Sequence, residues 1–381
     1  MKKIITIIGA RPQIIKASAI SRAIKNEFSD LIEEIIVHTG QHYDENMSDI
    51  FFTEMNIPKP KYNLNAGSSS HANQTAEIMK GLEEIIISEK ADGLLIYGDT
   101  NSTLAGALAA SKIHIPVIHV EAGLRSFNKS MPEEINRIMS DHVSTLLFCP
   151  TKTAINNLEK EGFDLTHDNK ATIDKPNVYL CGDIMFDNSL HFSKVSDSNA
   201  TLMKELNLEE NKFILVTIHR NANTDDTEKL NAIFSALLDI QKATSLKIVL
   251  PLHPRTKKMM ADLLKTELLQ EIESNNDFKI IPPAGFLDII SLEKNSRMIV
   301  TDSGGLQKEA YFFEKPCVIL RPQTEWIEIV ENGNAILTDA DSEKIISATN
   351  FLLNKNDFTY PNLFGDGKAA EFIVKKICEE I

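Results

Sequence analysis

The feature that most constrains the fold is a repeated alternation between short apolar runs and longer segments of helical periodicity. Short apolar runs bounded by polar residues are typical of buried parallel strands. Strands that alternate with helices indicate βαβ units, and therefore a doubly wound parallel sheet. The predicted strands cover residues 4–8, 34–38, 94–97, 117–120, 146–148, 213–217, 247–250, 279–281, 298–301 and 317–320, and the predicted helices cover 14–25, 74–88, 103–112, 151–161, 228–240, 257–269, 305–313 and 369–381.

The pattern occurs twice, once in each half of the chain. A length of 381 residues exceeds what one hydrophobic core usually holds. We therefore predict an α/β fold with two doubly wound Rossmann-like domains that face each other across a cleft. The N-terminal domain covers 1–185, the C-terminal domain covers 186–365, and a final helix in 366–381 packs back on the first domain.

Charge and composition exclude several classes of partner. The formal net charge of -14 argues against a general nucleic-acid or membrane-surface partner. No apolar run approaches the roughly 18 residues of a membrane span. The four cysteines show no CxxC spacing, so we expect neither a zinc site nor disulfides, and a cytoplasmic location. A GxGxxG fingerprint is missing, so nicotinamide or flavin binding lacks its usual support. We expect no cofactor.

Carboxylates follow the predicted strands of the first half at the edge where open α/β sheets bind ligands. Glu121 comes directly after the run 117–120, where a carboxylate needs a partner, and is the strongest catalytic candidate. Asp99 could act as an acid or base, or could cap the following helix. Glu133 is a third candidate acid, or the end of a capping box that begins at Ser130.

Basic residues and a histidine lie at equivalent positions. Arg11 and Lys16 stand one turn apart at a predicted helix start, which favours contact with an anion over an ordinary turn. His219 follows the strand 213–217 and precedes Arg220, a better than average placement for a functional histidine.

The second half contains a candidate phosphate cradle. Ser303, Gly304 and Gly305 join the strand 298–301 to a helix, as in turns whose backbone amides bind phosphate oxygens. Glu309, one turn further on, could accept hydrogen bonds from a ribose diol. A plain strand-to-helix turn with a surface glutamate would show the same residues.

Together these residues resemble the motifs of the UDP-N-acetylglucosamine 2-epimerase family. The resemblance runs in order from residue 3 to the turn at Gly365. The matching motifs are Gly9-Ala10-Arg11-Pro12, Gly98-Asp99-Thr100, His119-Val120-Glu121-Ala122-Gly123-Leu124-Arg125, Pro132-Glu133-Glu134, His219-Arg220 and Asp302-Ser303-Gly304-Gly305.

The resemblance implies the GT-B architecture of two Rossmann-like domains, with UDP held mainly by the second, and a homodimer. It implies epimerisation at C2 of a UDP-sugar, UDP-N-acetylglucosamine to UDP-N-acetylmannosamine, for surface polysaccharide and without a redox cofactor. The implied roles are proton transfer for Asp99, Glu121 and Glu133, with His219 beside the sugar; contact with the diphosphate and sugar for Arg11, Lys16 and Arg137; diphosphate binding for Ser303, Gly304 and Gly305; and ribose binding for Glu309.

Three departures from the family pattern bear on the sugar. Gln13 replaces a common Glu, Asn221-Ala222-Asn223 replaces Arg-Glu-Asn, and Trp326 replaces a sugar-contacting Arg. With the segment 125–128, they resemble the subgroup that acts on UDP-2,3-diacetamido-2,3-dideoxy-glucuronate. The motifs would also suit a glycosyltransferase of the same architecture, a hydrolysing epimerase or a nucleotide-sugar sensor.

Overall fold

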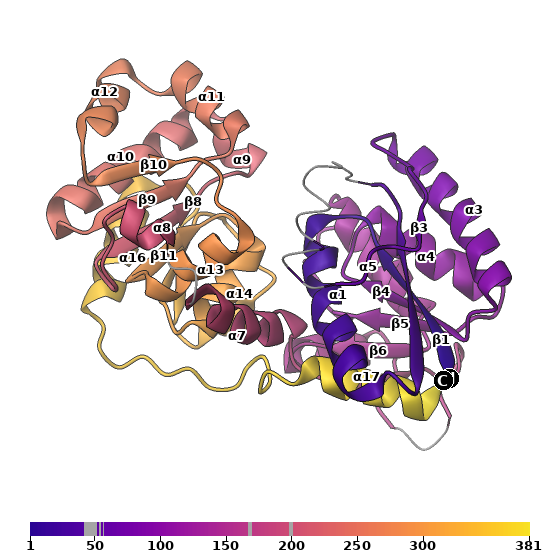
Figure 1. The fold of residues 1–381 in the computed structure, drawn as a ribbon. Helices are drawn as coiled ribbons and strands as arrows, with labels where there is room; N and C mark the ends of the chain where they lie inside the picture. Colours follow the sequence, from indigo (N-terminus) through magenta and orange to yellow (C-terminus); the bar gives the residue numbers. More distant parts are fainter. Residues whose placement is uncertain (42–51, 53–54, 56, 167–169, 198–200) are drawn as a thin grey trace. The chain divides into compact units, whose positions relative to one another are not determined.

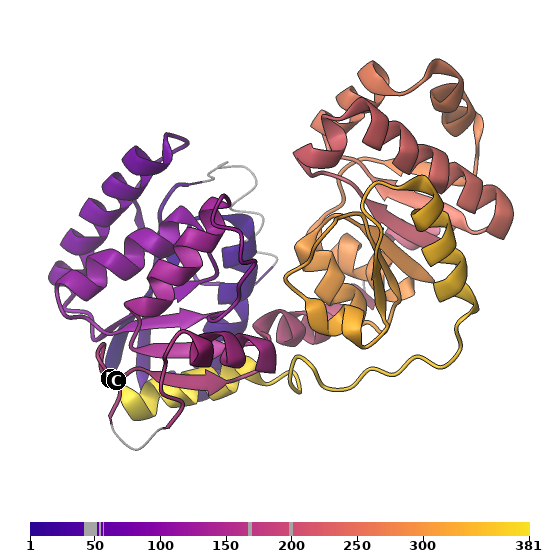
Figure 2. The ribbon, with the colours of Figure 1, turned by 180° about the vertical axis from the view of Figure 1, so that it is seen from behind.

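The computed structural model consists of two α/β units, each a parallel sheet with helices on both faces (Figures 1 and 2). It describes residues 1–41, 52, 55, 57–166, 170–197 and 201–381. Unit 1 comprises Met1–Asn188 together with Asn362–Ile381, and unit 2 comprises Ser189–Pro361. The α/β class with two parallel sheets is confirmed. The roles predicted for the domains 1–185 and 186–365 stay predictions.

Unit 1 contains a seven-stranded parallel sheet in the order β3-β2-β1-β4-β5-β6-β7. The order reverses beside β1, which pairs with both β2 and β4. Ligands of such sheets bind beyond the carboxyl ends of the strands at this switch point. The strands are β1 (Lys2–Ile8), β2 (Ile32–His38), β3 (Tyr62–Asn63), β4 (Gly93–Tyr97), β5 (Val117–Val120), β6 (Leu146–Cys149) and β7 (Asn177–Leu180).

The helices of unit 1 bury one apolar face each against this sheet. Ile78 and Leu82 of α3, for example, are fully buried in a cluster with Ile5 and Ile96 of the sheet. The helices are α1 (Arg11–Ala23), which continues as the π-helical η1 (Ile24–Phe28), α3 (His71–Glu89), α4 (Asn101–Lys112), α5 (Pro132–His142), α6 (Lys152–Lys160), the start of α7 (Ile184–Asp197) and α17 (Ala369–Glu380).

Unit 2 contains a six-stranded parallel sheet in the order β10-β9-β8-β11-β12-β13, with its switch point between β8 and β11. Its strands are β8 (Phe213–Thr217), β9 (Lys247–Pro251), β10 (Phe278–Ile281), β11 (Met298–Thr301), β12 (Cys317–Ile319) and β13 (Ala335–Leu337). Its helices are α8 (Thr201–Glu205), α9 (Asn221–Thr224), α10 (Thr227–Thr244), α11 (Pro254–Leu263), α12 (Thr266–Ser274), α13 (Phe286–Asn295), α14 (Gly304–Phe312), α15 (Ile327–Glu331) and α16 (Ser342–Asn354).

The predicted helix 257–269 is wrong, because the structure divides this region into α11 and α12. Asn231 explains the break. Its side-chain amide donates to the Leu263 carbonyl oxygen at 2.8 Å and accepts from the Lys265 amide at 2.9 Å. A side chain from α10 thus satisfies backbone groups that a continuous helix would have paired internally.

The C-terminal helix α17 contacts α1 and completes unit 1 (Figure 1). Its buried face is apolar and consists of Ala369, Ala370, Ile373, Val374 and Ile377. Asp187 anchors its start, accepting hydrogen bonds from the Ala369 amide at 3.2 Å and the Ala370 amide at 2.8 Å. These two bonds pair amides that the first turn of a helix leaves unsatisfied.

None of the helices in the described parts of the chain is long and apolar enough to cross a membrane. Across the same residues, no group of three or more His, Cys, Asp or Glu side chains could hold a metal ion. The four cysteines are free thiols.

We predict that the carboxyl group of Asp187 makes the stability of the protein depend on pH. Burial is the largest effect on this group and, although the two amides oppose it, raises its pKa to about 6 from 3.8. Since the folded protein favours the protonated form, the protonated carboxyl contributes to the free energy of unfolding. This contribution is complete below about pH 4 and is lost as pH rises to about 6. Asp187→Asn keeps an acceptor for α17 and cannot ionise.

The measurement is urea unfolding of wild type and Asp187→Asn at pH 5 and pH 7.5. We expect the free energy of unfolding of the variant, relative to that of wild type, to be higher at pH 7.5 than at pH 5 by on the order of 1 kcal/mol. Asp187→Leu, which has no acceptor, is the control and should be destabilised at both. A constant difference between wild type and Asp187→Asn would contradict the prediction.

Candidate functional site

The switch point of unit 1 brings together Lys16 from α1, Gly98 from the end of β4, and Glu121 from the end of β5. The Lys16 ammonium forms an ion pair with the Glu121 carboxylate, and both side chains are largely buried. Gly98 has a φ of +62°, and a Cβ atom there would stand 3.2 Å from Lys16 Nζ and 3.4 Å from Glu121 Oε2. Glycine therefore leaves the space in which the pair forms.

Gln13 fixes the neighbouring turn. Its side-chain oxygen accepts from the Gly9 and Ala10 amides, and its nitrogen donates to the Tyr97 carbonyl oxygen at 3.0 Å. A glutamate could not donate to that carbonyl. The amide side chain is thus what this junction between the ends of β1 and β4 requires.

Glu121 holds a backbone conformation that is unfavourable for its residue type. Its φ is +73°, in the left-handed region that costs an L-residue roughly 1–2 kcal/mol. The cause is local: the Glu121 and Ala122 amides both donate to the Phe148 carbonyl oxygen at 3.0 Å. A strained, non-glycine residue at the end of a strand is the kind of outlier that marks functional sites.

Asp99 pairs with Arg137 of α5. Arg137 Nη2 lies 2.5 Å from Asp99 Oδ2, and Nη1 lies 3.0 Å from Glu134 Oε2. The Asn136 side chain donates to the Asp99 carbonyl oxygen at 2.8 Å. The capping role considered for Asp99 is wrong, because the N-cap of α4 is Thr100, whose side chain accepts from the Thr103 amide.

Glu133 lies in the first turn of α5, on an exposed face. The capping box expected with Ser130 is wrong, since the N-cap is Met131 and the first turn has no side-chain cap. Its neighbour Glu134 is buried instead and accepts from the Ser126 and Phe127 amides, both at 2.8 Å. Burial alone would raise the pKa of Glu134, but these hydrogen bonds and Arg137 hold it below its ordinary value.

A buried polar network supports this site and was missed by sequence reasoning. His119 Nδ1 lies 2.7 Å from Asp141 Oδ1, and Nε2 lies 2.8 Å from the Gly98 carbonyl oxygen. Asp141 also accepts from Arg125 Nη1 at 2.7 Å and from the Gly123 amide at 3.1 Å. The signal was available, because His119 is a polar residue inside an otherwise apolar strand.

In unit 2 the predicted phosphate cradle lies at the N-terminus of α14, with Ser303 as N-cap. Neither Gly304 nor Gly305 has a positive φ, and a Cβ atom on either would meet only side-chain atoms, at 3.7–3.8 Å. Packing within unit 2 therefore does not require glycine here. What glycine leaves is open space before the amides of a helix N-terminus, as anion sites need.

Charged side chains border this space. A Cβ atom on Gly305 would lie 3.8 Å from Glu309 Oε2, and a Cβ atom on Gly304 would lie 3.7 Å from Arg321 Nη1. Arg321 is held by Glu325 through two hydrogen bonds of 3.0 and 2.8 Å. Sequence reasoning missed Arg321, although it directly follows the predicted strand 317–320, the same placement that identified Glu121.

His219 is positioned by Asp302. Asp302 is fully buried and accepts from His219 Nδ1 at 3.0 Å and from the His219 and Arg220 amides. Burial would raise the pKa of Asp302, yet these bonds and one from Asn223 keep it below its usual value. The His219 ring is half exposed, at 52%, so a fixed imidazole faces solvent.

The structure brings Lys16, Asp99, Glu121 and Arg137 together around the end of β4, while Arg11 begins α1 with an exposed side chain. Within unit 2 it groups Ser303, Gly304, Gly305 and Glu309 at one helix terminus. The catalytic and binding roles of these residues stay predictions.

Comparison with known proteins gives the family. The sequence model described as UDP-N-acetylglucosamine 2-epimerase matches residues 24–378. The chain belongs to this family. Its curated members are epimerases of nucleotide sugars, which are isomerases.

Similar proteins align over nearly the whole chain. A UDP-N-acetylglucosamine 2-epimerase homolog of Methanococcus maripaludis is 47% identical, over 98% of both chains. The UDP-2,3-diacetamido-2,3-dideoxy-D-glucuronate 2-epimerase of Pseudomonas aeruginosa is 46% identical over 99% of both. The crystal structure of the Methanocaldococcus jannaschii UDP-GlcNAc 2-epimerase, in complex with UDP-GlcNAc and UDP, matches at 42% identity and a TM-score of 0.84, covering 99% of both chains.

The backbone of Glu121 yields a stability prediction. At a position of ordinary φ, a protein with Gly is less stable than the same protein with Ala by roughly 0.5–1 kcal/mol. At a positive φ, the protein with Gly is the more stable of the two. We therefore expect Glu121→Gly to be more stable than Glu121→Ala by about 1 kcal/mol, although both lack the carboxylate. Chemical denaturation of the two variants measures the difference. An Ala variant as stable as the Gly variant would show that this φ carries no strain.

Proposed function

We propose that this protein is a non-hydrolysing UDP-N-acetylglucosamine 2-epimerase, which forms UDP-N-acetylmannosamine for a surface polysaccharide. The observation that carries the proposal is the pair of acids at adjacent strand ends, Asp99 and Glu121, each bound to its own cation. The family membership supports it, as does the similar M. jannaschii enzyme, whose structure contains UDP-GlcNAc and UDP.

In the proposed complex, unit 2 holds the nucleotide. The amides of Gly304 and Gly305 bind diphosphate oxygens, where the helix dipole favours negative charge. Arg321, whose guanidinium borders Gly304, adds a positive charge. The Glu309 carboxylate accepts hydrogen bonds from the ribose diol. Arg11, Lys16, Arg137 and His219 bind the diphosphate and sugar.

The chemistry explains why acids and cations are both needed. No carbonyl acidifies the C2 hydrogen, so the bond from C1 to UDP must break with strong assistance from cations and amide dipoles. A carboxylate takes the C2 proton, and a C1–C2 double bond forms. A proton is then delivered to the opposite face of C2, and UDP adds back to C1. Asp99, Glu121 and Glu133 are the groups proposed for these transfers, with His219 beside the leaving group.

A second substrate is favoured by the residues around Trp326. Its indole is buried, and Lys308 Nζ lies 4.1 Å from the ring centroid, a cation–π contact. Trp326 replaces the arginine common in the family, and the similar P. aeruginosa enzyme is named for UDP-2,3-diacetamido-2,3-dideoxy-D-glucuronate. In deuterated water, mass spectrometry of each UDP-sugar separates the two substrates, because C2 epimers have equal mass and only the sugar that is epimerised takes up deuterium.

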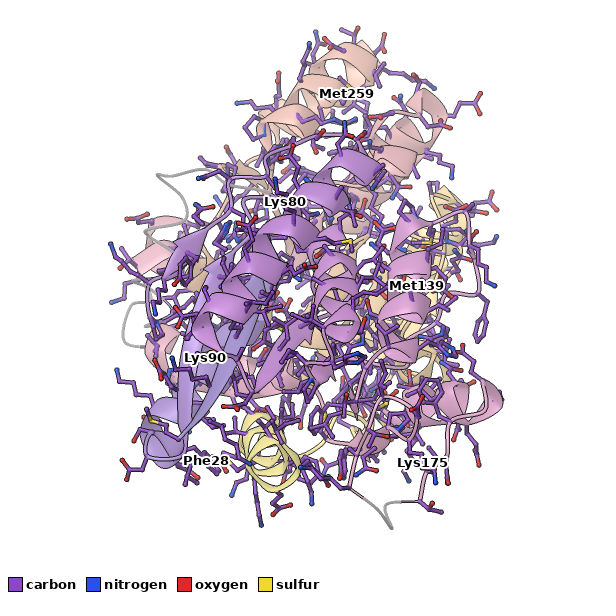
Figure 3. All side chains as sticks on the ribbon, turned by 90° about the vertical axis from the view of Figure 1, so that its right-hand side faces the viewer. Phe28, Lys80, Lys90, Met139, Lys175 and Met259 are labelled. Atoms are coloured by element: carbon purple, nitrogen blue, oxygen red, sulfur yellow. The ribbon has the colours of Figure 1, made fainter. Side chains whose placement is uncertain are left out.

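We also propose a cytoplasmic homodimer. Free thiols fit a reducing compartment. On unit 1, α3, α4 and α5 surround a hollow of about 520 Å³ lined by Met79, Leu104 and Ile135, among others. Figure 3 looks onto this side, with Lys80 on α3 and the half-exposed Met139 on α5 labelled. Light scattering should give a dimer for wild type and a monomer for Ile135→Glu; a monomeric wild type would contradict the proposal.

The reaction predicts solvent exchange at C2. In deuterated water, NMR of UDP-N-acetylglucosamine with the enzyme should show deuterium at C2 and an intact UDP linkage at equilibrium, without any acceptor. A glycosyltransferase would need an acceptor, a hydrolysing epimerase would release free sugar and UDP, and a sensor would leave the sugar unchanged. Absence of C2 exchange with both candidate UDP-sugars would refute the proposed reaction.

The role of Glu121 predicts a separation of turnover from binding. Glu121→Gln keeps the shape of the side chain but cannot accept a proton as a carboxylate does. We expect kcat to fall by roughly 10²–10⁴-fold, the usual contribution of general acid–base catalysis, while the Kd for UDP stays within a few-fold. Calorimetry with UDP and thermal unfolding are the controls. Unchanged turnover would remove Glu121 from the mechanism.

A further inference from the structure

Glu293 of α13 is a carboxyl group in a place where a charge cannot be solvated. It is 0% exposed, and neither of its oxygens has a hydrogen-bond donor within reach among the described residues. An ionised carboxylate in such a place costs several kcal/mol or more, so Glu293 must carry a proton.

The group next to Glu293 is the carboxyl of Glu309. Helices α13 and α14 are in contact, and Glu309 of α14 is the carboxyl group that acts on Glu293. Burial, and then the proximity of Glu309, raise the pKa of Glu293 well above its ordinary value. Two neighbouring carboxyl groups that are buried together share one proton.

The direction of Glu309 connects this pair to the nucleotide site. Its Oε2 lies at the N-terminus of α14, 3.8 Å from the position of a Cβ on Gly305. Glu309 is itself only 7% exposed, so a largely buried carboxylate borders the open space before the glycines.

We propose that Glu293 is a neutral carboxylic acid that donates its hydrogen bond to Glu309, and thereby positions the Glu309 carboxylate to accept from the ribose hydroxyls of the nucleotide. The inference rests on the proposed function, in which Glu309 binds the ribose. It makes Glu293 a positioning residue that sets the preference for ribose over 2′-deoxyribose without touching the ligand.

Two variants of Glu293 separate the donor from the bulk of the side chain. Glu293→Gln retains a donor, its amide NH₂, and nearly the same shape. Glu293→Met removes the donor and fills a similar volume with a flexible apolar chain. Glu309→Gln, which removes the carboxylate proposed to bind the ribose, is the reference.

The experiment is calorimetry of UDP and 2′-deoxy-UDP binding to the full chain. Wild type should bind UDP more tightly than 2′-deoxy-UDP by about tenfold to a hundredfold, because a hydrogen bond to a charged group contributes about this much to affinity. Glu293→Gln should keep most of this preference, whereas Glu293→Met should lose most of it, as Glu309→Gln does. A merely structural role would weaken both nucleotides alike and leave their ratio unchanged, which would overturn the inference.

The outcomes also distinguish this inference from the proposed function. If Glu309→Gln loses the preference and Glu293→Met retains it, Glu309 binds ribose and only the role of Glu293 is wrong. If Glu309→Gln retains it, the ribose contact is wrong and the role of Glu293 falls with it, while C2 exchange still tests the epimerase reaction.

Infrared spectroscopy tests the neutral acid without a ligand. Wild type should show a protonated-carboxyl C=O band that is sensitive to deuteration and is lost in Glu293→Gln. This readout remains available if Glu293→Met does not fold. A band of equal intensity in wild type and Glu293→Gln would overturn the inference.

Discussion

The carboxylate of Asp141 organises the candidate site of unit 1. It accepts from the His119 ring, the Arg125 guanidinium and the Gly123 amide. These donors belong to β5 and the segment after it, whereas Asp141 belongs to α5. Burial works to raise the pKa of Asp141, but His119 and Arg125 outweigh it and hold the pKa below its ordinary value. The negative charge is therefore maintained in the interior.

His119 links this carboxylate to the end of β4. The ring also contacts the Gly98 carbonyl oxygen, one residue before Asp99. Helix α5 supplies Arg137, which holds the Asp99 side chain. The positions of Asp99 and its cation thus depend on one buried contact between strand and helix. Unit 2 uses the same device, since buried Asp302 holds His219 and the Arg220 amide at the end of its central strands.

The sequence was sufficient for most of the fold because buried parallel strands have a strong apolar signal. The strands 117–120, 213–217 and 298–301 have the predicted bounds. The sequence prediction omitted β3, β7 and β13, which have only two to four residues. The predicted helix ends were wrong where a distant side chain determines them. The break between α11 and α12 depends on Asn231, which lies more than thirty positions away.

Candidate site residues could be found where a charge follows an apolar run, as for Glu121 and Asp99. Their buried partners gave no such signal, because Arg137, Asp141 and Glu293 lie within helices, where charged residues ordinarily face water; Arg137 was named only through the family resemblance. Only the packing of the helices reveals that these are buried. The capping roles considered for Asp99 and Glu133 depended on local sequence alone, and both failed because each helix begins one residue away from the position assumed.

The discontinuous composition of unit 1 has a consequence for biosynthesis. Unit 2 is one continuous segment, Ser189–Pro361, whereas unit 1 needs α17, which follows unit 2 in the sequence. During translation, the surface of α1 that receives the apolar face of α17 must wait uncovered until the rest of the chain has emerged. Unit 2 can therefore acquire its native fold first, although the chain of unit 1 is made earlier, and nascent unit 1 is the part most exposed to aggregation and to chaperones.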